Sequence, residues 1–221
     1  MTAPFEAHLV TTGGTSPPLE QTARSYPRRS LGKGDTLYRA GDLADTVYLV
    51  GEGLVKLALD VSGGKERIVG VAGPGDFIGA LTPMHVTFQE SAEALSPRVE
   101  VQAIDVGSID DSLLTAIYRA AGTHLLRLQE ALEDNELPAA SRLARALMRL
   151  GRRFGHTSEE GLVHLTLPLT HEHFAALVGA ARETTTTLLS EMREAGVLHG
   201  TRGRYTFNSE RMSEYAMSAA D

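Results

Sequence analysis

The hydrophobic pattern of the chain changes its period near residue 110, so that one kind of secondary structure cannot account for all of it. From about Gly32 to Gly107, short alternating runs of apolar and polar residues are cut by glycine-containing turns at residues 51–53, 62–64 and 73–76. The stretch RVEVQAIDVGSI, residues 98–109, adds another strand or two. Strands this short, with turns this frequent, predict an antiparallel barrel or jelly roll.

A long helix is predicted over residues 109–137, where apolar residues recur every three or four positions. This heptad-like stripe has two interpretations: it packs on the strand-rich part of the same chain, or it forms a two-stranded seam between two copies. We favour the seam, although one long helix can present different faces to both. Asn135, a polar residue near the end of the stripe, suits a position that sets the register of two paired helices. The stripe consists of Leu114, Ile117, Ala121, Leu125, Leu128, Leu132 and Asn135.

Leu137-Pro138 is predicted to end this helix and begin another, because the residue before a proline avoids helical dihedrals while proline suits a first turn. An amphipathic helix with Leu143, Leu147 and Leu150 on one face should follow, then a loop at 151–161 and a strand within LVHLTLPLT. The chain is therefore predicted to be α+β. Its parts are a loosely ordered lead-in at 1–28, a β-rich domain at 29–108, the long helix at 109–137 and a C-terminal domain at 138–221.

The C-terminal domain carries the pattern of a winged helix-turn-helix. Thr170 is a candidate N-cap for a first helix that Gly179 ends, and a second helix within ARETTTTLLSEMREAG ends at Gly196. Two short helices joined by a tight glycine-containing turn are typical of a motif whose second helix enters the DNA major groove. The following VLHGTRGRYTFN predicts two short strands around a turn, which is a wing.

Four consecutive threonines lie in the second helix although threonine is a mediocre helix former. Helical spacing directs Leu188, Leu189 and Met192 inward, with Thr185 on the same side. The outward face carries side chains that suit base edges and phosphates, and short hydroxyl side chains let a helix sit deep in a groove. The alternative is that the Arg-Glu pair at the start of this helix forms a surface ion pair, and that the helix merely tolerates the threonines. The outward residues are Arg182, Glu183, Thr186 and Thr187.

Charge and composition permit DNA binding and exclude several other classes of site. The net charge is −7, but residues 138–221 hold ten arginines, no lysine and nine acidic residues, and arginine makes forked contacts with phosphates and guanine. The chain has no cysteine, which excludes disulfides and iron–sulfur clusters. His171 and His173 lie two residues apart on one helix and point to different faces, so no metal site is expected. We expect neither an enzyme nor a membrane protein, and a cytoplasmic location.

From about residue 29 to 208 the chain resembles the Crp/Fnr family of bacterial transcription regulators. The resemblance is carried by Gly41-Asp42, VYLVGEGLVKL, GGKERIVGVAGPGDFIGAL and LTHEHFAALVGAARET. It implies a cyclic-nucleotide-binding-type β-roll, a long dimerisation helix and a winged helix-turn-helix. It also implies a homodimeric activator that binds a near-palindromic promoter site and contacts RNA polymerase.

The sequence departs from the cyclic-AMP receptors of that family at the effector pocket. Ala80 stands where the resemblance implies an acidic ribose ligand, and Glu90-Ser91 stands where it implies an arginine for the cyclic phosphate. A carboxylate there repels a phosphate, so cyclic AMP is not expected to bind; neither an iron–sulfur cluster nor haem is expected. Glu90 is a candidate ion-pair partner of Arg127, with two solvated charges as the alternative. The degenerate effector pocket comprises Gly79, Ala80, Leu81, Glu90, Ser91, Arg127 and Leu128.

On the DNA side, Arg182 and Glu183 match the family's base readers, whereas Thr187 replaces a third reader that is an arginine in the cyclic-AMP receptors. The half-site should therefore be altered or relaxed at one base pair. Two alternatives stay open: a regulator switched by an unidentified small molecule in the β-roll, and a scaffold that does not read DNA. Thr170, His171, Arg202 and Arg204 are predicted to contact phosphates. The full set of predicted DNA-binding residues is Thr170, His171, Ala181, Arg182, Glu183, Thr186, Thr187, Arg202 and Arg204.

Overall fold

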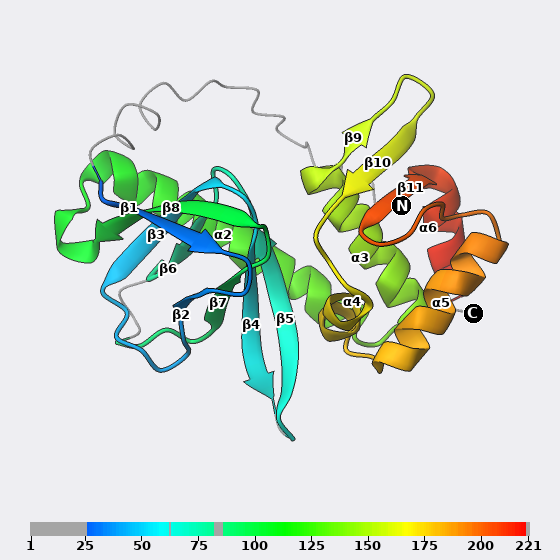
Figure 1. The fold of residues 1–221 in the computed structure, drawn as a ribbon, viewed down its shortest axis with the longest axis horizontal. Helices are drawn as coiled ribbons and strands as arrows, with labels where there is room; N and C mark the ends of the chain where they lie inside the picture. Colours follow the sequence, from blue (N-terminus) through cyan, green and yellow to red (C-terminus); the bar gives the residue numbers. More distant parts are fainter. Residues whose placement is uncertain (1–25, 62, 82–85, 220–221) are drawn as a thin grey trace, which may run out of the picture.

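The computed structural model describes residues 26–61, 63–81 and 86–219, so most of the predicted lead-in at 1–28 lies outside it. Two four-stranded antiparallel sheets, in the orders β1-β8-β3-β6 and β2-β7-β4-β5, make up the N-terminal part (Figure 1). Their strands are β1 (Arg28–Gly32), β2 (Thr36–Tyr38), β3 (Thr46–Glu52), β4 (Val55–Val61), β5 (Lys65–Ala72), β6 (Phe77–Gly79), β7 (Ser91–Ala94) and β8 (Arg98–Asp105).

The two sheets share one core, which is why the alternating pattern predicts them well. Val50 and Val101 from the first sheet and Val55 and Ala92 from the second belong to the same buried cluster. Their sequence neighbours point outward or to a second cluster, as the two-residue period of a strand requires. Gly53 turns β3 into β4 with a φ of +80°, and a side chain there would collide with the backbone of β8. The predicted antiparallel β-roll is confirmed.

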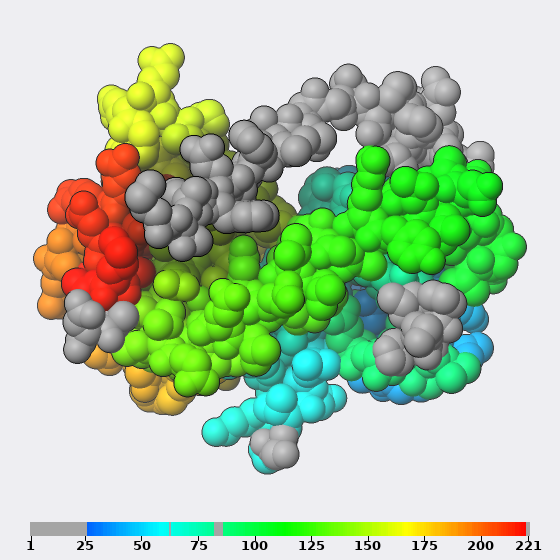
Figure 2. Space-filling view, turned by 180° about the vertical axis from the view of Figure 1, so that it is seen from behind, coloured from blue at the N-terminus to red at the C-terminus, as the bar shows by residue number. Residues whose placement is uncertain are grey.

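Helix α2 (Asp111–Asp134) follows the short 3₁₀ helix η2 (Val106–Ser108) and begins at Asp110, whose carboxylate accepts a hydrogen bond from the Leu113 amide at 2.8 Å. It is shorter at each end than the predicted 109–137. Leu113 and Ile117 are buried against β3, β6 and β8, so the predicted placement of Ile117 on an outward seam is wrong. Tyr118, one position further on, is 61% exposed instead. Figure 2 shows α2 in green across the outer face of the molecule.

The C-terminal part packs helices around a small antiparallel sheet of order β11-β10-β9. The predicted break at Leu137-Pro138 is confirmed, with Pro138 as the N-cap of the first helix rather than within its first turn. Its elements are α3 (Ala139–Phe154), β9 (His156–Thr157), β10 (Leu162–Thr166), α4 (His171–Val178), α5 (Arg182–Glu194), β11 (Arg204–Asn208) and α6 (Ser209–Ser218).

Three details of this part differ from the sequence prediction. Helix α3 continues to Phe154 and β9 pairs with β10, so residues 151–161 are not all loop. Gly151 lies inside this helix where it packs closely on the sheet, and a β-carbon there would lie 2.7 Å from the Phe207 ring, so the glycine allows the close approach. The first strand of the wing is reduced to one bridge, between His199 and Thr206, while β11 forms the second. Helix α6 has no counterpart among the predicted elements.

The two parts are joined by polar contacts and by a shared apolar cluster. Val71 and Leu95 of the roll lie in the same buried cluster as the core of the C-terminal part. Asp76, in the turn before β6, is bound by Arg153 of α3 at 2.5 Å and lies 3.6 Å from the Arg127 guanidinium of α2. These contacts hold α3 against the roll.

Candidate nucleic-acid interface and effector pocket

Helix α4 has the predicted ends, and they position the turn that follows. The Thr170 hydroxyl accepts a hydrogen bond from the His173 amide at 3.2 Å, and the His173 ring accepts one from the Thr170 amide at 3.3 Å. Gly179 closes the helix in the left-handed region with a φ of +63°, as a C-terminal glycine does. Ala181 is then extended and is the N-cap of α5, where its side chain leaves the first helical amides uncapped.

The second helix divides into an inward and an outward face where the sequence predicts. Thr185, Leu189 and Met192 are fully buried, and the Thr185 hydroxyl donates to the Ala181 carbonyl at 3.1 Å. Leu188 is half-buried against the same core. The outward face, which is exposed along its whole length, carries Arg182, Glu183, Thr186 and Thr187.

Arg182 is held only weakly within the chain. Its Nε lies 3.8 Å from Glu172 Oε2 of α4, and the two side chains are 65% and 71% exposed. Exposed ion pairs of this kind contribute about 0–1 kcal/mol. The alternative surface ion pair therefore joins Arg182 to Glu172 rather than to Glu183, and it leaves the guanidinium free to move to a stronger partner.

The threonine hydroxyls are engaged along the helix. Thr186 donates to the Arg182 carbonyl at 2.9 Å, and Thr187 donates to the Glu183 carbonyl at 3.2 Å. The His171 ring nitrogen Nδ1 lies 3.0 Å from the Thr186 hydroxyl and can donate to it. With these donors used inside the helix, the outward face presents compact methyl groups and oxygen lone pairs, which suit thymine methyl groups and hydrogen-bond donors.

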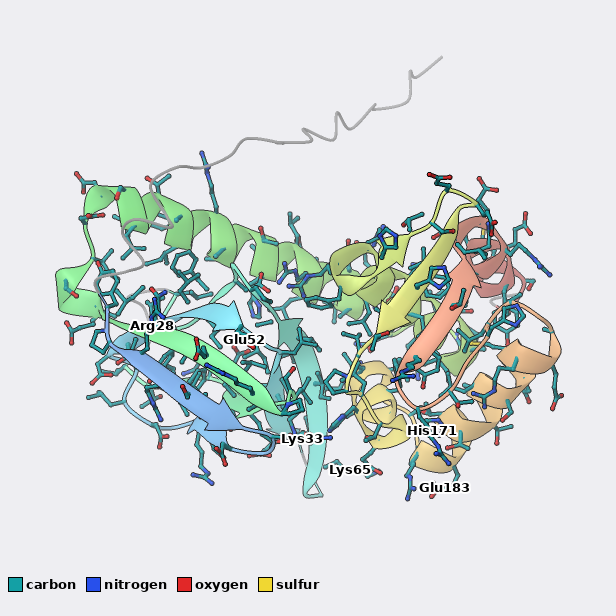
Figure 3. The ribbon with its side chains drawn as sticks, turned by 45° about the horizontal axis from the view of Figure 1, so that its top comes forward. Arg28, Lys33, Glu52, Lys65, His171 and Glu183 are labelled. Atoms are coloured by element: carbon teal, nitrogen blue, oxygen red, sulfur yellow. The ribbon has the colours of Figure 1, made fainter. Side chains whose placement is uncertain are left out.

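A cavity of about 630 Å³ lies between the start of α4 and the wing. Thr170, His171 and Arg202, three of the residues predicted to contact phosphates, line it together, and Arg204 is exposed at the start of β11 nearby in sequence. Burial, and then the charges of Arg193 and Arg182, hold the pKa of His171 below its usual range. Figure 3 shows His171 and Glu183 at the same end of this domain.

Two cationic side chains of this cavity are absent from the residues predicted from the sequence. Lys33 comes from the turn between β1 and β2, far away in the chain, and no local pattern points to it. Arg193 lies in the last turn of α5. Its position on the amphipathic helix was the one feature of the sequence that could have indicated it. Together with Arg202, these two side chains place three cations around one cavity beside the predicted recognition helix.

A second cavity, of about 540 Å³, lies between the roll and α2. Five of the predicted pocket residues line it: Gly79, Ala80, Leu81, Glu90 and Leu128. Ser91 and Arg127 do not; the Ser91 hydroxyl accepts from the Ala40 amide at 3.0 Å, and Arg127 faces Asp76. The candidate Glu90–Arg127 ion pair is therefore wrong, because one turn of α2 separates Arg127 from the position facing Glu90.

Glu90 faces His124 instead, with 3.9 Å between Oε2 and Nε2. Burial raises the pKa of Glu90 to about 7, while burial and the charge of Arg127 lower the pKa of His124. Burial therefore disfavours the charged form of both groups, and their separation is too long for a hydrogen bond. In the same lining, the Tyr38 hydroxyl is buried and makes no hydrogen bond of normal geometry among the described residues, although the Gly79 amide lies close to it.

Within the described ranges, no group of three or more histidines and carboxylates is placed to hold a metal ion. The helices of those ranges are all too short or too polar to cross a bilayer.

Comparison with known proteins matches both parts of the chain. Residues 28–115 match the cyclic nucleotide-binding domain, and residues 141–212 match the Crp-like helix-turn-helix domain. The cyclic AMP receptor protein of Thermus thermophilus is 30% identical over 193 residues, which cover 84% of this chain and 86% of that protein. The CRP-like cAMP-activated global transcriptional regulator of Mycobacterium tuberculosis is 28% identical over 173 residues, covering 74% of this chain and 76% of that one.

The fold is also that of solved regulators. The structure of a CRP/FNR-family transcriptional regulator from Thermus thermophilus superimposes with a TM-score of 0.71 at 28% identity, covering 87% of this chain and all of that chain. None of these three proteins is named as an enzyme, which agrees with the prediction from the sequence. With both domains matched in order and most of the length shared, the chain belongs to the CRP/FNR family of transcription regulators.

Proposed function

We propose that the protein is a homodimeric transcription activator that reads a near-palindromic promoter site without cyclic AMP. The observation that carries the proposal is the exposed edge of α5, where Arg182, Glu183, Thr186 and Thr187 lie side by side with no strong partner. Contact with RNA polymerase is inferred from the family. A protein that reads bacterial promoters works where the chromosome is, so we place it in the cytoplasm.

Homodimerisation is supported by an apolar stripe along the outer face of α2. Leu114, Tyr118, Leu125 and Leu132 are between 39% and 69% exposed. With Tyr118 in place of Ile117, the spacing alternates strictly between four and three residues through Ala121, Leu128 and Asn135. The helix has 24 residues and spans about 36 Å, long enough for several turns of contact with a second copy. Asn135 also accepts a hydrogen bond from Arg67 at 2.9 Å, which fixes its place at the end of the stripe.

DNA reading is assigned to Arg182 and Glu183, whose side chains suit guanine and the cytosine amino group. Thr187 cannot make the bidentate contact of an arginine, so the half-site should be relaxed at one base pair. Thr170, His171, Arg202 and Arg204 are assigned to phosphates, with the amides at Ala181 and with Lys33 and Arg193 beside them. Two copies of α5 would then lie about one helical turn of DNA, ~34 Å, apart.

Independence from cyclic AMP rests on the cavity between the roll and α2. Glu90 lines it, Ala80 offers no hydrogen bond to a ribose, and the described lining residues include no arginine or lysine. A cyclic phosphate would enter beside a carboxyl group with no cation to offset its charge. Titration calorimetry with cyclic AMP should show no heat of binding; micromolar affinity would contradict this part of the proposal.

Selection of bound sites from random duplexes tests the DNA-reading proposal. The wild-type protein should enrich two inverted half-sites separated by about ten base pairs. Arg182→Ala should lose that enrichment, whereas Arg28→Ala, which removes the same charge at the far end of the molecule (Figure 3), should keep it. Recovery of no motif by the wild-type protein, or of the same motif by Arg182→Ala, would contradict the assignment.

A second candidate is a regulator switched by a small molecule, and the 540 Å³ cavity is the observation that favours it. Tight, specific DNA binding by the purified protein alone supports the constitutive activator, whereas binding that needs an added metabolite extract supports the switch. A scaffold that does not read DNA predicts no salt-dependent, sequence-selective affinity at all.

A further inference from the structure

The cavity between the roll and α2 is apolar and aromatic, with one carboxyl group. Tyr38 and Phe88 of the roll and Tyr118 of α2 contribute aromatic side chains to its lining. Ala44, Ala80, Leu81, Leu125 and Leu128 contribute aliphatic ones. Among the described lining residues Glu90 is the one acidic side chain, and none is a lysine or an arginine. The charge that this cavity presents to a ligand is therefore negative whenever Glu90 is ionised.

Glu90 has no cation of its own among the described residues. Its side chain is 18% exposed; His124 of α2 faces it, and Tyr38 of β2 lines the same cavity. His124 is 3.9 Å away and is disfavoured as a cation by burial. Arg127, three residues after His124 on α2, is engaged with Asp76. A carboxylate in such a place is costly unless a partner offsets its charge, and a ligand can be that partner.

Tyr38 gives a second, independent indication of a ligand. The residue is 4% exposed and lines the cavity, and its hydroxyl makes no hydrogen bond of normal geometry among the described residues, although the Gly79 amide lies close to it. Buried hydroxyls are nearly always paired, so an unpaired one in a cavity wall is a place where a ligand's polar atom can bind. Its ring stacks on Phe88 at 4.0 Å and on Tyr48 at 5.7 Å between centroids, which holds the side chain in the cavity wall.

We propose that this cavity binds a small organic ammonium ion. The charged nitrogen lies beside Glu90 and donates one N–H to its carboxylate and one to the Tyr38 hydroxyl oxygen. The hydrocarbon part of the ligand contacts Phe88, Leu81 and Leu128. A volume of about 540 Å³ is in the ordinary range for sites that enclose small molecules. The inference rests on the second candidate function, the regulator switched by a small molecule, and names the class of ligand for its cavity.

Three probes with one carbon skeleton test the charge preference: 2-phenylethylammonium, the neutral 2-phenylethanol and the anionic phenylacetate. Each is titrated calorimetrically into the full-length protein at pH 8, where Glu90 is mostly ionised. We expect the ammonium ion to bind at least about tenfold more tightly than the alcohol, and phenylacetate to bind most weakly, because only the cation gains from Glu90.

Variants assign the preference to the cavity. Glu90→Gln should bring the ammonium ion and the alcohol to similar affinity, and Tyr38→Phe should weaken the ammonium ion while leaving the alcohol nearly unchanged. Glu130→Gln, an exposed position of α2, is the matched control and should behave as the wild type. Circular dichroism checks that each variant is folded.

Three results would overturn the inference: no binding of any of the probes, equal or tighter binding of phenylacetate, or an unchanged preference in Glu90→Gln. None of these measurements involves DNA. A failure here would therefore leave the assignment of α5 untouched, and a failure to read DNA would not alter the ligand result.

Discussion

Glu90→Gln should change how the stability of the protein depends on pH. Burial raises the pKa of Glu90 from an ordinary 4.5 to about 7, so the folded protein holds this proton more tightly than the unfolded chain does. Stability from this effect is complete below pH 4.5 and is lost as the pH rises through 7. At about 1.4 kcal/mol for each pH unit, the loss amounts to about 3 kcal/mol.

Glutamine fills nearly the same space and cannot ionise, so the variant lacks this loss. The difference in unfolding free energy between wild type and variant should therefore shift by about 3 kcal/mol in favour of glutamine between about pH 4.5 and pH 8.5. His124 acts in the opposite sense, because its lowered pKa adds stability above its usual value that is lost as the pH falls. It is present in both proteins, so its contribution largely cancels in the difference.

Urea unfolding followed by circular dichroism at pH 4.5, 6, 7 and 8.5 measures this difference. Glu130→Gln serves as the control, since Glu130 is exposed on the same helix. A constant difference between wild type and Glu90→Gln over the whole range would refute the reasoning, because it would mean that Glu90 titrates alike in the folded and unfolded states.

Three further predictions concern the seam, the core and the half-site. In analytical ultracentrifugation the wild type should sediment as a dimer and Leu125→Glu with Leu132→Glu, at positions 58% and 69% exposed, as a folded monomer; a monomeric wild type or a dimeric variant would contradict the proposed seam. Phe174→Ala should lower the unfolding free energy by about 3–5 kcal/mol, since Phe174 is fully buried and packs edge-on against Tyr205 at 5.6 Å; a loss below about 1 kcal/mol in urea would contradict that packing. Thr187→Arg should tighten binding to sites with guanine at one half-site position by about 1–3 kcal/mol in fluorescence anisotropy, and an equal gain on all sequences would show a phosphate contact instead.

Much of the fold follows from local periodicity. The inward side of α5 is predicted correctly because Thr185, Leu189 and Met192 repeat at helical spacing around a buried line. The same rule is insufficient on α2, where two adjacent faces are apolar. Ile117 and Tyr118 differ by one position, and only the position of the roll decides that Ile117 is covered.

The remaining errors concern residues that meet in space from distant parts of the chain. Lys33 reaches the cavity beside α4 from the turn after β1, and no nearby sequence pattern indicates this. The residue of α2 that faces Glu90 depends on how far the helix is shifted along the roll. The sequence alignment placed Arg127 there, whereas the structure places His124, three residues earlier, beside Glu90. Periodicity gives the face of an element, whereas such pairings depend on how whole elements are packed.

The most direct test of the central claim is the affinity of the purified protein for its selected site and for a scrambled duplex of the same composition. Wild type should prefer the selected site by about a thousandfold or more, with affinity for both falling as salt is raised. Arg182→Ala should reduce that preference by at least about tenfold while binding the scrambled duplex nearly as before, and Arg28→Ala should leave the preference intact. Equal losses on both duplexes in Arg182→Ala, or no preference in the wild type, would contradict the claim that the exposed edge of α5 reads DNA bases.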